Sequence, residues 1–188
     1  MTIKLNKRFK LRIPQVALFL LSFVGVGLVT SCEQVSCPLN NTVESKYGFY
    51  ASARTADGVF AEGPAVTVAD SLSVCILGTD SVLINRQYNI SGVALPVSFY
   101  GETDALQFSF KDQQGAVGRD TLWIHKQSHP HFDDPSCPVH VWHVVTAVES
   151  THHLIDTILI NHAEINYDGL ENFQIYFFTS DDDEQTTE

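Results

Sequence analysis

The chain lacks the sequence signals of the common catalytic and nucleic-acid-binding classes. It contains no Gly-x-Ser-x-Gly, no glycine-rich phosphate loop, no His-Glu-x-x-His and no paired Cys-x-x-Cys. Basic residues are few, because 11 Lys and Arg stand against 22 Asp and Glu, for a formal charge of −11. So acidic a protein repels phosphates, and we therefore expect no nucleic-acid partner. These absences favour a protein that is not an enzyme.

No apolar run is long enough to span a membrane, although one lies near the N-terminus. Residues 16–28 are apolar, follow five basic residues with no acidic one among them, and fall short of the about 20 residues of a spanning helix. This order is typical of an export signal. The next residues, Val29-Thr30-Ser31-Cys32, resemble the lipobox of bacterial lipoproteins. The resemblance implies cleavage of residues 1–31 and lipidation of Cys32; an ordinary secretory signal with an incidental cysteine is the alternative.

The predicted anchor determines where the protein is expected to act. Removal of residues 1–31 takes away five positive charges and leaves a formal charge of −16, so lipid rather than electrostatic attraction would hold the protein at a membrane. We expect the protein to lie in the cell envelope at the outer membrane, on either its periplasmic or its surface face. The expected partners are the membrane, through the lipid at Cys32, and another envelope protein or a glycan.

Three cysteines remain beyond Cys32, which allows one disulfide and one free thiol in an oxidising compartment. Cys75 lies in an apolar, strand-like run, where a free cysteine behaves as a small hydrophobic residue. Cys37 and Cys137 lie in polar segments flanked by proline, so we expect them to form the disulfide. The bond would lie five positions after Cys32, so at most about 18 Å of chain would join the lipid to the folded domain.

Residues 47–179 are expected to form one domain of short β-strands. Apolar residues alternate with polar ones at 106–110 and 173–177, the period of a half-buried strand. Runs rich in β-branched and aromatic residues, separated by turn formers, occupy residues 47–54, 81–88, 93–100, 121–125, 139–148 and 155–161. Such spacing predicts an all-β, antiparallel β-sandwich of Ig-like or related topology. Residues 32–46 would link the anchor to this domain, and residues 180–188 would form an acidic, disordered tail.

A short motif, Asp followed by Ser or Thr and an aliphatic residue, occurs four times. Its simplest interpretation is structural, because Asp and Ser or Thr cap turns and the apolar run that follows is a strand. The motif also resembles the O-glycosylation signal of exported proteins in the Bacteroidota. That resemblance implies glycans on Ser71, Ser81, Thr121 and Thr157, except where the site is buried at a strand centre.

Several features together resemble a family of small, uncharacterised lipoproteins from the Bacteroidota. They are the lipobox with Cys37 shortly after it, an Asp-Thr-Leu-Trp-Ile run at residues 120–124, a second cysteine at Cys137, and the ending at residues 165–177. The resemblance implies a β-rich fold and supports the pairing of Cys37 with Cys137. It implies no activity and no substrate.

All eight histidines fall within residues 125–162, and the densest part, residues 125–140, is expected to be a loop. Imidazole and carboxylate groups are good ligands for zinc and copper. A proline between two of the histidines keeps the chain extended, so both rings could reach one ion. The expected ligands are His129, His131, Asp133 or Asp134, and His140 or His125.

Other observations oppose a metal site. His140 and His143 lie in a β-branched run, and residues three apart on a strand face opposite sides, so these two cannot share one ion. Two functions therefore remain. The first is a lipid-tethered, non-catalytic binding or assembly module without a cofactor, and the alternative is a transition-metal-binding lipoprotein that uses residues 125–143.

Overall fold

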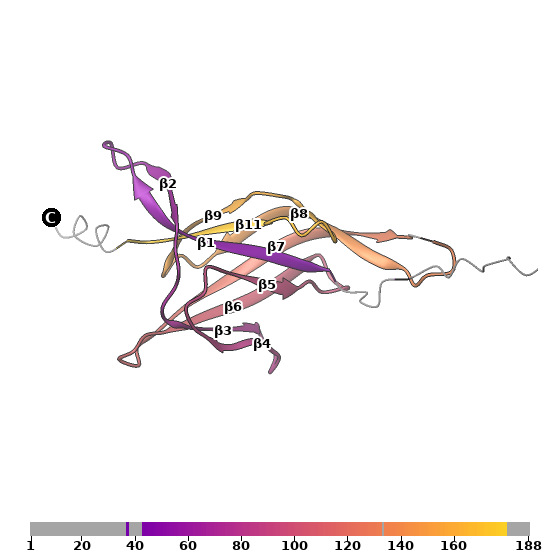
Figure 1. Cartoon of the computed structure of the whole chain (residues 1–188), viewed down its shortest axis with the longest axis horizontal. Coiled ribbons are helices and arrows are strands. Elements are labelled where there is room, and N and C mark those ends of the chain that lie inside the picture. The colour runs from indigo at the N-terminus through magenta and orange to yellow at the C-terminus, as the bar shows by residue number, and fades with distance from the viewer. Residues whose placement is uncertain (1–36, 38–42, 133, 180–188) are drawn as a thin grey trace, which may run out of the picture. The chain divides into compact units, whose positions relative to one another are not determined.

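The computed structural model describes residues 37, 43–132 and 134–179, which form β-strands and turns without a helix (Figure 1). Within this part of the chain, no helix has the length and apolar character that a membrane crossing needs. The predicted signal peptide, Cys32 and the acidic tail lie outside the described residues. The described residues, which hold all of the strands named below, fall within one compact unit. The all-β prediction is confirmed.

The first sheet is built around the N-terminal strand. Its order is β2 (Phe60–Ala65), β1 (Glu44–Arg54), β11 (Phe173–Phe177) and β9 (Ile155–Ile160), and β5 (Gly92–Pro96) pairs with the first half of β1. β1 and β11 are parallel, the only parallel pair among the described strands and an exception to the antiparallel prediction. A parallel pair needs a long crossover, and the chain between β1 and β11 includes the whole second sheet.

The second sheet is antiparallel throughout its described strands. Its order is β10 (Glu164–Ile165), β8 (His140–Ser150), β7 (Val117–His131), β6 (Thr103–Lys111), β3 (Ser71–Ile76) and β4 (Val82–Gln87). Local turn chemistry joins β6 to β7, since the Asp112 carboxylate accepts the Ala116 N–H at 2.8 Å and Gly115 adopts a φ of +96°. A positive φ strains most other residues, so this hairpin turn requires glycine or a close substitute.

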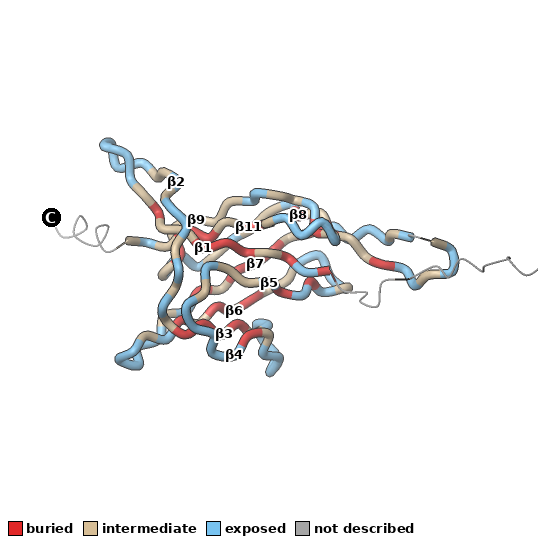
Figure 2. The backbone as a smooth tube through the Cα atoms, viewed as in Figure 1, coloured by how far each residue is buried: buried red, intermediate tan, exposed pale blue. Residues whose placement is uncertain are grey.

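The core lies between the two sheets, where the alternating apolar residues of both meet. Tyr47 on β1 stacks on Phe173 with ring centroids 4.8 Å apart, and meets the edge of Phe108 from the other sheet at 5.9 Å. Phe110 meets Phe177 across the same interface at 5.3 Å. The buried segments in Figure 2 follow these facing strands. The sandwich prediction is therefore confirmed.

The β7–β8 hairpin corrects one expectation and bears out another. Residues 125–131 belong to β7 and His140 begins β8, so most of the segment expected to be a histidine-rich loop is paired strand. The hairpin is long because β-branched and aromatic residues of β8 pair along this whole length. The connection between the strands holds Cys137, which forms the expected disulfide with Cys37. Cys75 on β3 is a free, half-buried thiol.

The repeated Asp motif has a structural role at Asp120, but not as a cap that precedes a strand. Asp120 lies inside β7, and its buried carboxylate accepts hydrogen bonds from the Thr151 hydroxyl at 2.6 Å and from the backbone N–H groups of His153, Leu154 and Ile155 at 2.7 to 3.0 Å. Burial acts to raise the Asp120 pKa, but these hydrogen bonds outweigh it and lower the pKa below its ordinary value. One carboxylate thus holds the turn between β8 and β9.

The four predicted glycosylation sites differ in their exposure. Ser71 is buried in β3, Ser81 is exposed in the turn before β4, and Thr121 and Thr157 are half-buried within β7 and β9. Because a glycan cannot be attached to a buried hydroxyl, the structure removes Ser71 from the set. Modification of the other three sites stays a prediction.

Candidate functional site

The inward-facing rows of two neighbouring strands end in charged residues. On β6 the row runs from Phe110 and Phe108 through Leu106 to Asp104, and on β7 it ends at Lys126. The Lys126 ammonium donates hydrogen bonds to the Ser98 hydroxyl and the Gly101 carbonyl, both at 3.1 Å, and forms an ion pair with Asp104 at 3.3 Å. The Lys126 side chain is 0% exposed and that of Asp104 is 14% exposed. A buried ammonium needs such partners, because desolvation of an unpaired charge costs several kcal/mol.

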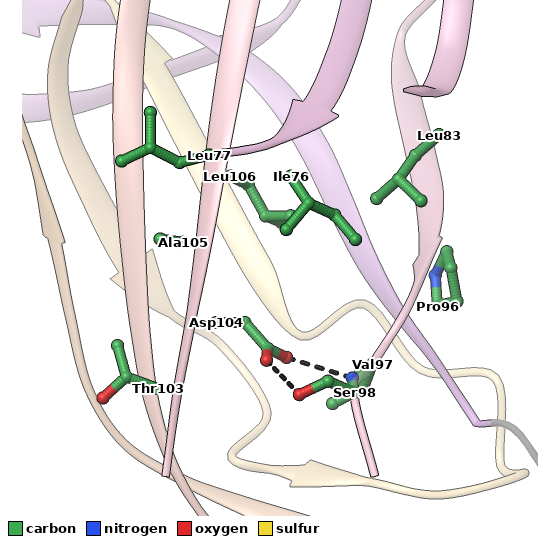
Figure 3. A pocket seen from close by; sticks show the side chains of 10 residues that line it. All are labelled: Ile76, Leu77, Leu83, Pro96, Val97, Ser98, Thr103, Asp104, Ala105 and Leu106. Atoms are coloured by element: carbon green, nitrogen blue, oxygen red, sulfur yellow. Dashed lines mark hydrogen bonds between the residues drawn. The ribbon is translucent and has the colours of Figure 1, made fainter. Parts of the chain in front are cut away.

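Ser98 connects this ion pair to the other sheet. It follows β5, and its backbone N–H donates to Asp104 at 3.2 Å while its hydroxyl also donates to the same carboxylate (Figure 3). Asp104, Lys126 and Ser98 are called the polar network below. The network closes one end of the space between the sheets.

A cavity of about 420 Å³ lies beside the polar network, between β5 with the residues after it in one sheet and β3, β4 and β6 in the other. Its volume falls within the range of small-molecule sites, about 300 to 1,000 Å³. Figure 3 shows Ile76, Leu83 and Pro96 toward one end and the Asp104–Ser98 contact toward the other. The residues that line the cavity are Ile76, Leu77, Leu83, Pro96, Val97, Ser98, Thr103, Asp104, Ala105 and Leu106.

His143 lies on the same inward face as Lys126. Its Nδ1 is 2.9 Å from the Ser128 hydroxyl, and burial together with the positive charge of Lys126 lowers its pKa to about 4. A perturbed pKa can mark a functional site, but buried structural networks produce it as well, and His143 does not line the cavity.

His143 makes the stability of the protein depend on pH. In the unfolded chain His143 takes up a proton near pH 6.5, whereas in the folded protein it stays neutral down to about pH 4. Between these values the unfolded state binds more protons, so the free energy of unfolding is expected to fall as the pH falls, by up to about 3 kcal/mol. Urea denaturation at pH 7 and at pH 4.5 measures this slope.

The variants His143→Gln and His129→Gln identify the residue responsible. His143→Gln should flatten the slope, because glutamine does not titrate and can still bond Ser128. His129→Gln, an exposed change on β7, should keep most of the slope, because His129 contributes less to the lowered pKa of His143 than burial and Lys126 do. Equal slopes in the wild type and in His143→Gln would contradict the assignment.

The described residues predicted to bind a metal do not form one ligand set, although His131 lies opposite His140 in the β7–β8 hairpin. His129 is exposed on β7, and the ring of His131 stacks on Trp142 with centroids 3.6 Å apart. The Nδ1 of buried His140 is 2.7 Å from the hydroxyl of Tyr167. Asp133 lies outside the described residues.

The other predicted ligands do not complete a shell. Asp134 bonds Ser136, and His125 contacts Thr103 and Glu149. Over residues 43–132 and 134–179, together with Cys37, no three His, Cys, Asp or Glu side chains come together as metal ligands. The described structure therefore does not support the metal-binding alternative.

The sequence interpretation missed the polar network, although the sequence contains a signal for it. Asp104 is in phase with Leu106 and Phe108, and Lys126 is in phase with Leu122 and Ile124. A charged residue in phase with core residues on each of two successive strand segments predicts a buried ion pair if the strands are neighbours. In the structure β6 pairs with β7, so this condition is met.

The fold and the cavity define a small all-β sandwich protein with space for a ligand between its sheets. Comparison with known proteins shows that the chain belongs to a family of unknown function (DUF6452), whose model matches residues 71–177. The matched segment runs from the start of β3 to the end of β11 and includes Asp104, Asp120 and Lys126. No curated protein and no solved structure matches the chain. The expected uncharacterised family is thus confirmed, and its lipoprotein character and Bacteroidota origin stay predictions.

Proposed function

We propose that this protein is a lipid-anchored, non-catalytic binding module of the bacterial cell envelope, and that the inter-sheet cavity is its ligand site. The cavity beside the polar network is the observation that supports the proposed ligand site. An apolar cavity of this volume with a few polar groups at one end is the usual form of a small-molecule site.

The anchor is proposed from the export signal and from Val29-Thr30-Ser31-Cys32. Two or more acyl chains at Cys32 would give stable attachment. The disulfide between Cys37 and Cys137 would then keep the domain within about 18 Å of the lipid, because Cys37 is only five positions after Cys32. We place the protein at the outer membrane, where an envelope protein or a glycan would be a further partner.

A non-catalytic role fits the chemistry beside the cavity. The Asp104 carboxylate and the Lys126 ammonium neutralise each other, and the Ser98 hydroxyl donates to Asp104. A serine nucleophile needs a neighbouring base that takes its proton and an oxyanion site beside the reacting atom. The acidic neighbour of Ser98 is already engaged in an ion pair with Lys126.

Binding of a neutral apolar dye tests the proposed ligand site. The experiment uses residues 33–188, which include every described residue, exported to an oxidising compartment and purified without detergent. N-phenyl-1-naphthylamine should bind with increased fluorescence, because the cavity walls are apolar. Leu83→Lys, which places an ammonium at the wall, should weaken binding about tenfold or more, a difference of about 1.4 kcal/mol.

Val82→Lys is the matched control for this experiment. Val82 precedes Leu83 on the edge strand β4 and is exposed, so the same substitution there leaves the cavity unchanged. Dye binding should match that of the wild type. The proposed ligand site is wrong if the wild type does not bind the dye, or if the two lysine variants bind it equally well.

A further inference from the structure

The polar end of the cavity presents a carboxylate rather than an ammonium. Asp104 lines the cavity and keeps 14% of its side-chain surface exposed, whereas the Lys126 side chain is 0% exposed. Figure 3 shows the Asp104 oxygen atoms at that end, next to Ser98. A ligand in the cavity therefore contacts Asp104 and not Lys126.

The Asp104 carboxylate has acceptor capacity left for a ligand. Its Oδ1 receives the Ser98 hydroxyl and the Lys126 ammonium, while within the described residues Oδ2 accepts one bond, from the Ser98 backbone N–H at 3.2 Å. A carboxylate offers about four acceptor sites, so a further donor can bond Oδ2 without displacing a protein group.

We propose that the cavity binds a small amphiphile with one apolar chain and a primary ammonium head. This inference rests on the proposed ligand site and adds the chemistry of the ligand. The apolar walls would hold the chain, and the head would donate a charge-assisted hydrogen bond to Asp104. The acidic protein, with a formal charge of −11 for the whole chain, attracts a cation and repels an anion of the same length.

Three ligands with the same chain and different heads test the proposal. Octylammonium, octanol and octanoate compete separately against N-phenyl-1-naphthylamine bound to residues 33–188. Octylammonium should displace the dye at a concentration about tenfold lower than either of the others. If the dye binds but the three competitors displace it equally well, or octanoate or octanol displaces it best, this inference is overturned and the ligand site stands. Failure of the dye itself to bind overturns the ligand site.

Two variants separate the local carboxylate from the overall charge. Asp104→Asn alone would leave the Lys126 charge buried and unpaired, so it is combined with Lys126→Met, which keeps the network neutral. This double variant should bind the dye and lose the preference for octylammonium. Glu149→Gln removes an exposed carboxylate elsewhere on the second sheet and should keep the preference. The inference is overturned if the double variant retains the preference or if Glu149→Gln loses it.

Discussion

Replacement of Asp120 by alanine is expected to lower the free energy of unfolding by about 5 kcal/mol, since three backbone N–H groups, one buried and two partly buried, would each lose their acceptor at a cost of about 1 to 3 kcal/mol. Those donors belong to His153, Leu154 and Ile155, at the turn from one sheet to the other. A loss of this size equals the whole stability of many domains of comparable length. Chemical denaturation of residues 33–188 at pH 7 measures it.

Two companion variants make the Asp120 prediction specific. Asp120→Asn keeps one oxygen acceptor and should lose less than Asp120→Ala. Asp80→Ala removes the carboxylate of the same short motif from an exposed turn, and it should change the free energy of unfolding by less than about 0.5 kcal/mol. If Asp120→Ala stays within about 1 kcal/mol of the wild type, the role assigned to this carboxylate is wrong.

The Asp120 carboxylate also predicts a loss of stability in acid. Its pKa is lower in the folded protein than in the unfolded chain, where it is 3.8. The stabilisation is therefore present above pH 3.8 and is lost as the pH falls through the lower pKa of the folded state. This window lies below that of His143, so the two residues act in successive pH ranges.

Removal of the disulfide is the second change with a large expected effect. The bond joins residues 100 positions apart, and in the chain-entropy model the closure of so long a loop stabilises the folded state by about 4 to 5 kcal/mol. The variant Cys37→Ser/Cys137→Ser should lose an amount of this order, measured as the shift in its denaturation midpoint at constant slope.

A reducing agent provides the control for this experiment. Reduction of the wild-type protein should reproduce the stability of the double variant, while the double variant itself should not respond to reduction. Cys75→Ala tests the remaining thiol, which is half-buried near Gln107, and the wild-type response to reductant should persist in it. Unchanged stability of the wild type, with mass spectrometry showing Cys37 and Cys137 both reduced, would contradict the prediction.

The fold class and the disulfide could be predicted because both depend on local patterns. The alternation around Leu106, Phe108 and Phe110 determines which side of a strand is buried, whatever the strand lies beside. The pairing of Cys37 with Cys137 followed from the apolar surroundings of Cys75, which stays free. The strand at residues 47–54 begins three residues earlier than expected, at Glu44, because it pairs with β5.

The topology and the candidate site could not be predicted in the same way, because both depend on which strands are neighbours. The histidine pattern at residues 125–140 suggested a loop with converging rings. In the β7–β8 hairpin His131 lies opposite His140, but their rings contact Trp142 and Tyr167 respectively. The ion pair of Asp104 with Lys126 becomes visible only when β6 lies beside β7. Asp120 resembles a turn cap in sequence, but its partners are about thirty residues away.

The parallel pairing of β1 with β11 has a consequence for the order of assembly. β1 is the first strand of the described chain and β11 the last, so the centre of the first sheet forms only after residue 177 is available. Pairing across such a sequence distance is slow, because the entropic cost of closing a long loop comes before any stabilising contact forms. β1 therefore lacks its partner β11 until the last strand of the described chain is available. For a protein that we propose is exported, the first sheet would thus be completed only after nearly the whole polypeptide has crossed the membrane.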